Sequence, residues 1–189
     1  MKKIIVLTGC ILAFSFVYGQ NLVQVGIQFG LDAPLNKKPL ADNFTMSRSF
    51  NFEAGACVRV GADFFGQTGV TYYVNKTILS FDTLSSDVEL GQINIPFLAG
   101  YRHAVGKSTF VRVMAGIQYR GLVRVSENIL EVNKNTFRKN NMDVIVGVGI
   151  DVSLITLDVS YRKAVKPLVS GSKNYQDVVN ISVGFLLYR

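Results

Sequence analysis

The chain has 189 residues, of which 49% are hydrophobic and 17% are charged, and this is the size of one ordinary domain. Its formal net charge is +7, but no nucleic-acid-binding motif accompanies the charge, so we expect no nucleic-acid partner. Two domains are not expected at this length.

The first nineteen residues have the features of a secretory signal peptide. Lys2 and Lys3 precede an apolar run from Ile4 to Val17, and the small residue Gly19 follows it. We expect cleavage after Gly19, which leaves residues 20–189 as the mature domain. A retained anchor is the weaker alternative, because a membrane-spanning helix needs about 20 apolar residues.

The cysteines limit the chemistry of the mature chain. Leu7-Thr8-Gly9-Cys10 is similar to a lipoprotein cleavage box, but cleavage there would leave a very short apolar lead-in, so acylation of Cys10 is not favoured. After cleavage at Gly19, Cys57 is the only cysteine, and no intramolecular disulfide can form. The same cleavage removes two lysines and no acidic residue, which lowers the net charge from +7 to +5.

Eight segments of the mature chain alternate between apolar and polar or small residues with a period of two, which is typical of β-strands with unlike faces. In the fourth segment, Ile93, Phe97 and Tyr101 share one face, while Gln92 and Arg102 share the other. No helix of useful length is expected. The predicted strands are 22–31, 50–61, 67–75, 92–102, 111–120, 143–152, 155–162 and 179–187.

The predicted connections alternate between short and long. Short turns are expected at 61–64, 103–107 and 153–154, and longer loops at 32–48, 76–89, 126–141 and 164–177. Strands of roughly 9–11 residues cross a bilayer when tilted, and the turn-and-loop asymmetry is that of outer-membrane barrels. The sequence therefore predicts an all-β fold: an eight-stranded antiparallel up-and-down transmembrane β-barrel with short periplasmic turns and longer extracellular loops.

The composition of the polar face favours the membrane barrel over a soluble, lipocalin-like ligand-binding barrel. Glycine weakens strands and is unusual on a solvent-exposed sheet face, whereas a narrow lumen has room for few large side chains. Many glycines share the polar phase of the predicted strands. They are Gly26, Gly30, Gly55, Gly69, Gly100, Gly116, Gly147, Gly149 and Gly184.

Four stretches carry a family resemblance: 25–31 (VGIQFGL), 93–101 (INIPFLAGY), 147–150 (GVGI) and 158–161 (DVSY). The sequence resembles the PorT-like, or porin-like, small outer-membrane β-barrel family of the Bacteroidota over essentially the whole mature chain. The resemblance implies a non-enzymatic barrel in the outer membrane of a Gram-negative bacterium. It also implies a role in the cell envelope, and assistance to a secretion apparatus is one such role.

Charged residues in the lumen phase are the candidate functional residues. From their heights along adjacent strands we expect a cluster of Arg102, Arg112 and Asp151 near the periplasmic end, and a cluster of Arg120, Asp143 and Arg162 near the outer end. The favoured interpretation is that they fill and rigidify the barrel, and a selective pore or proton-coupled site is the alternative. The other lumen charges are Glu53, Arg59 and Asp158.

Catalysis is not expected, nor is a cofactor or a metal. His103 is the only histidine, it falls in a predicted turn, and no nucleophile is placed to pair with it. No spacing of His, Cys and carboxylates is typical of a metal site. Cys57 is interpreted as a small lumen-facing filler. Pro96 lacks an N–H donor, so within a strand it predicts a bulge or a local break.

The outer surface suggests lipid and protein partners. Aromatic residues are expected to form girdles at the membrane interfaces. They are Phe50, Phe52, Tyr72, Tyr101, Tyr119 and Tyr161. A solvated surface is the default interpretation of the basic residues in or near the loops. The alternative is contact with outer-membrane lipid and lipopolysaccharide, or with envelope or secretion proteins through the loops or the periplasmic turns. The basic residues are Lys37, Lys38, Arg48, Arg138, Lys139, Lys163, Lys166 and Lys173.

Three functions remain open from the sequence: a structural or interaction protein of the envelope, a transporter of a small or hydrophobic solute, and the soluble ligand-binding barrel.

Overall fold

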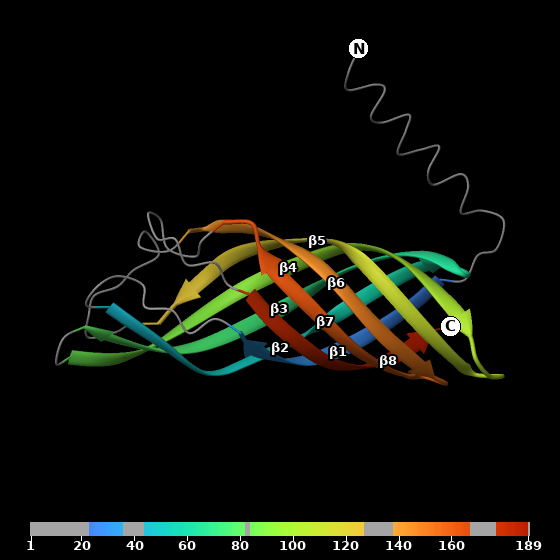
Figure 1. Ribbon diagram of the computed structural model, residues 1–189, viewed down its shortest axis with the longest axis horizontal. Helices are drawn as coiled ribbons and strands as arrows, with labels where there is room; N and C mark the ends of the chain where they lie inside the picture. The colour runs from blue at the N-terminus through green and yellow to red at the C-terminus, as the bar shows by residue number, and fades with distance from the viewer. Residues whose placement is uncertain (1–22, 36–43, 82–83, 127–137, 167–176, 189) are drawn as a thin grey trace, which may run out of the picture.

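The computed structural model describes residues 23–35, 44–81, 84–126, 138–166 and 177–188, and these form a closed antiparallel barrel (Figure 1). Each strand pairs with its neighbours in sequence, and β1 pairs with β8 to close the sheet. The predicted eight-stranded antiparallel barrel is therefore confirmed. The strands are β1 (Val23–Pro34), β2 (Phe44–Gly61), β3 (Phe64–Phe81), β4 (Leu84–Ala104), β5 (Thr109–Val125), β6 (Asn140–Val152), β7 (Ile155–Ala164) and β8 (Asp177–Tyr188).

The apolar faces of the strands point outward and the polar faces point inward. On β4 the side chain of Phe97 is 54% exposed, whereas Gln92 and Asn94 are 1% exposed. Successive side chains point to opposite faces of a strand, so closure of the sheet places one of the two sets in the lumen. A soluble lipocalin-like barrel needs the reverse arrangement, and that alternative is wrong for this chain. Among the described residues, no helix is long and apolar enough to cross a membrane.

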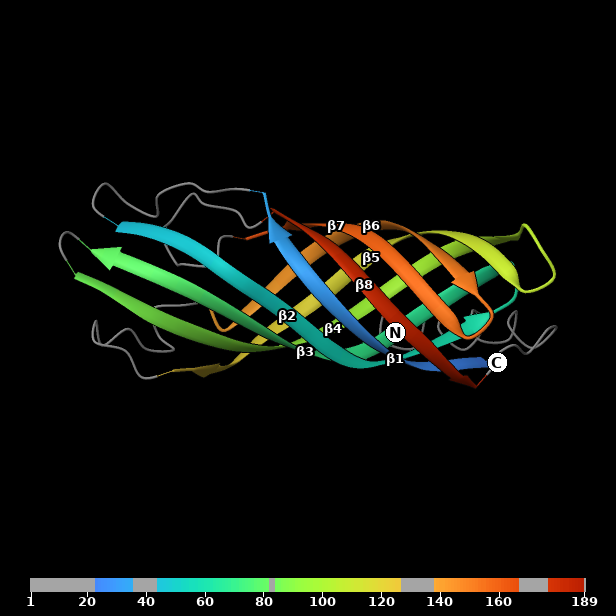
Figure 2. The ribbon, with the colours of Figure 1, turned by 90° about the horizontal axis from the view of Figure 1, so that it is seen from below.

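The two ends of the barrel differ. At one end, which we call the turn end, short connections join β2 to β3, β4 to β5 and β6 to β7. The opposite end is the loop end. There β2, β3 and β4 project well past β1 and β8 (Figure 2). The strands β2 to β5 have 17–21 residues each, whereas β1, β6, β7 and β8 have 10–13, so the barrel wall is much taller on one side.

The predicted long loop over 76–89 is wrong. Instead, β3 continues to Phe81, β4 begins at Leu84, and the two remain paired up to these residues. Strand β2 also pairs with β3 over this extension. The polar composition of the segment indicated a loop, but the backbone groups are satisfied by ladder hydrogen bonds, and Thr77 and Ile78 are β-branched residues that favour strands.

The β2–β3 turn depends on glycine at its first position. Gly61 has φ of 127°, which L-residues with a side chain rarely adopt, and a Cβ added there would lie 2.2 Å from the carbonyl oxygen of Phe64. We expect Gly61→Ala to lower the free energy of unfolding by about 1–3 kcal/mol, measured by urea titration in lipid vesicles. Gly106→Ala is the matched control, because the nearest atom to its added Cβ would be 3.6 Å away. Equal effects of the two substitutions would contradict this account of the turn.

Candidate functional site in the barrel interior

The described interior contains five arginines and five carboxylates. Most are buried below a tenth of their surface, and the Asp158 side chain is 13% exposed. The opposite charges are equal in number, so the described lumen has no net formal charge. The arginines are Arg59, Arg102, Arg112, Arg120 and Arg162, and the carboxylates are Asp32, Glu53, Asp143, Asp151 and Asp158.

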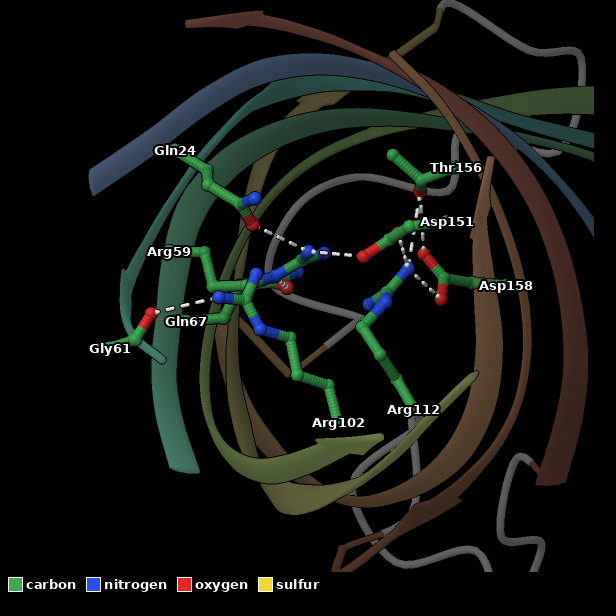
Figure 3. Close-up of polar contacts among 9 residues, drawn as sticks. All are labelled: Gln24, Arg59, Gly61, Gln67, Arg102, Arg112, Asp151, Thr156 and Asp158. Atoms are coloured by element: carbon green, nitrogen blue, oxygen red, sulfur yellow. Dashed lines mark hydrogen bonds and ion pairs between the residues drawn. The ribbon is translucent and has the colours of Figure 1, made fainter. Parts of the chain in front are cut away.

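Four of these residues form a network toward the turn end, which we call the turn-end network: Arg59, Arg112, Asp151 and Asp158 (Figure 3). Asp151 is its centre. Its two carboxylate oxygens lie 3.0 Å from Nη1 of Arg59 and 2.9 Å from Nη2 of Arg112. Arg112 is 0% exposed and also contacts Asp158 at 2.8 Å. The network thus ties together β2, β5, β6 and β7.

Neutral groups add hydrogen bonds to the turn-end network. The guanidinium of Arg59 donates to the side-chain oxygens of Gln67 at 3.0 Å and Gln24 at 2.9 Å. Arg112 donates to the Thr156 hydroxyl at 3.3 Å. Guanidinium and carboxylate groups are costly to bury unless they are paired and hydrogen-bonded, and these contacts lower that cost. Nε and Nη1 of Arg112 have no hydrogen-bond partner among the described residues.

The expected cluster of Arg102, Arg112 and Asp151 differs from the arrangement in the structure. Arg112 and Asp151 are in contact, and they are joined by Arg59 and Asp158, which the sequence left outside the two clusters. Arg102 donates to the carbonyl oxygen of Gly61 at 3.5 Å (Figure 3), and its guanidinium lies 5.1 Å from the ring centroid of Phe110.

A second network, the loop-end network, consists of Arg162, Asp32, Glu53 and Asn180. Arg162 on β7 contacts Asp32 on β1 and lies 3.1 Å from Glu53 on β2. Asn180 on β8 donates to Asp32 at 2.6 Å and to Glu53 at 3.0 Å. The network therefore spans the closure of the barrel, where the first two strands meet the last two.

The expected cluster of Arg120, Asp143 and Arg162 is wrong in one member. Arg120 and Asp143 pair at 2.5 Å, but the carboxylates that contact Arg162 are Asp32 and Glu53. Heights estimated along neighbouring strands do not show which residues meet across a closed lumen. The sequence pattern does not indicate Asp32, because residues 32–48 have the composition of a loop, although the alternation of β1 extends to Asp32 in the lumen phase.

Between the two networks lies a polar cavity of about 50 Å³, which holds only a few water molecules. Glu53 and Arg162 line it from the loop-end network and Asp158 lines it from the turn-end network. Closer to the loop end, Val88 and Leu90 on β4 point inward and are 1% and 0% exposed. The interior is thus filled by ion networks at two levels and by apolar side chains above them.

The β3–β4 ladder is interrupted at Pro96. Cross-strand partners are present at Thr68 and Phe97 and again at Thr71 and Asn94, with no pairing between. Pro96 has no N–H to donate, and its carbonyl oxygen accepts a hydrogen bond from the Thr68 hydroxyl at 2.8 Å. Pro96 also lines the polar cavity, so the interruption lies in the wall directly beside it.

We expect Thr68→Val to lower the free energy of unfolding by about 1 kcal/mol, because valine has nearly the same shape but cannot donate a hydrogen bond to the carbonyl oxygen of Pro96. Urea titration of the refolded protein measures it. Thr109→Val, at the start of β5, is the control for a strand threonine away from the interruption. A Thr68→Val variant as stable as wild type would show that this hydrogen bond does not stabilise the wall.

The two remaining candidate residues are not part of the ion networks. His103 is exposed at the end of β4, and Cys57 is buried in the lumen phase of β2. No group of three or more His, Cys, Asp or Glu side chains in the described part of the chain is placed to hold a metal ion.

Outward-facing aromatic residues lie at two levels. Phe52 and Tyr72 lie near the middle of β2 and β3, and Tyr119 lies in the loop-end half of β5. Near the turn end, the rings of Tyr101 and Phe64 are tilted by 52° with a centroid distance of 5.0 Å. Tyr161 is half-buried on the outer face of β7, and the side chain of Phe50 lies outside the described residues. Of the basic residues, Arg138, Lys139, Lys163 and Lys166 are described at the loop end, while Lys37, Lys38, Lys173 and the side chain of Arg48 lie outside the described part.

The fold is that of the small β-barrels found among outer-membrane proteins. The chain is similar to the outer membrane protein OprG from Pseudomonas aeruginosa, with a TM-score of 0.56, 10% identity, and coverage of 89% of this chain and 96% of OprG. Weaker likenesses are to the N-terminal β-barrel domain of Pseudomonas aeruginosa OprF (TM-score 0.41, 11% identity, 89% and 100% coverage) and to LpxR from Salmonella typhimurium (0.39, 9%, 86% and 99%). At these identities the likeness to OprG shows the fold alone. No protein-family model matches the sequence, and no curated protein matches it significantly.

Proposed function

We propose that this chain is a non-enzymatic β-barrel of the Gram-negative outer membrane with a structural or interaction role in the cell envelope. The observation that carries the proposal is the inversion of the barrel: an apolar outer face encloses a polar, charge-balanced interior. Such an outer face is stable in lipid, where a closed sheet leaves no backbone group unsatisfied. The aromatic residues at two levels support the same placement.

The interior favours a plugged barrel over an open channel. An eight-stranded lumen is just wide enough for side chains to fill it, and here Arg59, Arg112 and Asp151 bridge it at one level and Arg162 at another. The polar cavity between the two networks, of about 50 Å³, is too small for a metabolite. The protein then acts through its surfaces, which are the lipid-facing wall, the periplasmic turns and the extended loop end.

A PorT-like role beside a secretion apparatus is the particular form of this proposal. The tall sheet formed by β2, β3 and β4 at the loop end is a broad surface on which an envelope partner can dock (Figure 2). Lipopolysaccharide is the second partner that we propose, because exposed basic residues lie at the same end. A cleaved signal peptide over 1–19, outside the described residues, is consistent with this destination.

Membrane fractionation together with heat-modifiable gel migration tests the location. We expect the mature chain in the outer-membrane fraction, with unboiled and boiled samples that migrate differently because the folded barrel resists detergent. Recovery in the soluble periplasmic fraction would end the proposal.

Single-channel recording in planar bilayers tests the plug. We expect no stable current steps from the wild type, because both networks cross the lumen. Arg124→Gln, an exposed arginine at the loop end, controls for unspecific changes of surface charge. Stable stepwise currents from the wild type that change in Arg112→Ala but not in Arg124→Gln would show a conducting lumen.

Passage of a small solute is the second candidate function, and one observation favours it. The polar cavity touches the β3–β4 wall where the ladder is interrupted at Pro96. Uptake of a radiolabelled small solute into proteoliposomes that depends on the barrel would favour this candidate, and uptake equal to that of empty vesicles would exclude it for the solute tested.

A further inference from the structure

A shallow groove crosses the outer face of the barrel over β5, β6, β7 and β8. Its volume is about 480 Å³ and its lining is almost entirely apolar. The outward side chains in it come from two adjacent cross-strand rows. These side chains are Val113, Val148 and Val159 in one row, and Val146, Tyr161 and Val179 in the next.

Small side chains make the groove. Ala115 occupies the β5 position beside Val146, so the wall is low there, whereas the rows of the opposite wall carry Phe29, Phe52 and Tyr72. In a bilayer such a hollow has to be filled by something of matching shape, because lipid-exposed surfaces associate by van der Waals packing and not by release of water.

The loop-end border of the groove is polar. Lys163 lies on β7 one row beyond Tyr161, is exposed, and has Val144 and Asp177 as its cross-strand neighbours. Tyr161 also interacts with the carboxyl of Asp177. A lysine and a tyrosine therefore lie where the apolar groove meets the loop end, with the carboxylate of Asp177 close to both.

We propose that this groove binds lipid A, with an acyl chain in the valine-lined hollow and a phosphate of the disaccharide at Lys163. The inference rests on the proposed outer-membrane location, in which the loop end faces the outer leaflet. The complementarity is of two kinds: an apolar trough for a saturated chain, and a cation at its outward end for the phosphate. A phospholipid has the same elements, but Lys163 lies at the loop-end limit of β7, and this places the bound phosphate at the outer leaflet.

Native mass spectrometry of the refolded mature protein, titrated with bis-phosphorylated lipid A, tests the proposal. Lys163→Gln is expected to weaken lipid A binding about fivefold, because a basic residue near a membrane surface contributes about that factor toward an anionic lipid. The same variant is expected to bind dephosphorylated lipid A as the wild type does. Val146→Trp fills the hollow and is expected to weaken the binding of both forms.

Lys76→Gln and Val70→Trp are the matched controls, since both residues are exposed on the outer face of β3, away from the groove. All four variants must show heat-modifiable migration, which establishes folding. Binding of phosphatidylglycerol as tight as that of lipid A, or control variants as weak as Lys163→Gln and Val146→Trp, would overturn the assignment. If the barrel fractionates with the outer membrane but all variants bind lipid A equally, this inference is contradicted and the proposed function is not. Recovery of the chain outside the outer membrane would contradict the proposed function itself.

Discussion

Replacing Asp151 with asparagine is expected to lower the free energy of unfolding by about 3–5 kcal/mol, which is the usual loss when one partner of a buried ion pair is removed. Asp151 is the only carboxylate that contacts both Arg59 and Arg112 in the described interior, at 3.0 and 2.9 Å. Asparagine keeps the side-chain shape, so the loss in free energy of unfolding measures the effect of removing the charge. Urea titration of the barrel in phospholipid vesicles, followed by gel migration, measures it.

Glu89→Gln is the control for Asp151→Asn. Glu89 also faces a basic residue, Lys76, but their charged atoms are 3.8 Å apart and their side chains are 39% and 61% exposed. An exposed pair contributes at most about 1 kcal/mol. If both variants lost the same small amount, the turn-end network would not stabilise the barrel.

The second large effect is expected for Arg162→Met. Methionine fills much of the arginine volume but leaves the carboxylates of Asp32 and Glu53 buried beside each other, with Asn180 as the remaining donor. We expect a loss of about 3–5 kcal/mol in the free energy of unfolding. The double variant Arg162→Met with Glu53→Gln is expected to be more stable than Arg162→Met alone, because one uncompensated charge is removed.

Lys163→Met, at the next residue of β7, controls for the loss of an arginine-like charge on the outer face. Its effect is expected to remain within about 0.5 kcal/mol. Glu53→Gln can be added to the wild type or to Arg162→Met. If it lowers the free energy of unfolding by the same amount in both, the two residues are not coupled.

The architecture was predictable because the alternation of side chains is local. Gln92 and Asn94 face the lumen and Ile93 and Phe97 face outward, as the period of two requires, and an even number of such strands with short turns closes in only a few ways. The glycines of the polar phase indicated a narrow lumen for the same local reason.

The limits of the prediction lie where contacts are not local. The stretch from Lys76 to Glu89 has the composition of a loop, but pairing between β3 and β4 makes Lys76–Phe81 and Leu84–Glu89 strand. Arg162 was expected beside Asp143 because their strands are adjacent, but closure brings β7 near β1 and β2, where Asp32 and Glu53 lie. Side-chain length and direction across the lumen decide such partners, and neither is visible in the spacing of residues along the chain.

The loop-end network joins residues far apart in the chain: 130 positions separate Arg162 from Asp32, and 109 separate it from Glu53. These bonds form only once the last strands have reached the first, so they are late events in assembly. Interactions absent from the transition state slow unfolding and leave the rate of folding nearly unchanged. We therefore expect Arg162 to act chiefly on the lifetime of the inserted barrel, and the variant Arg162→Met to unfold faster while it inserts at the wild-type rate.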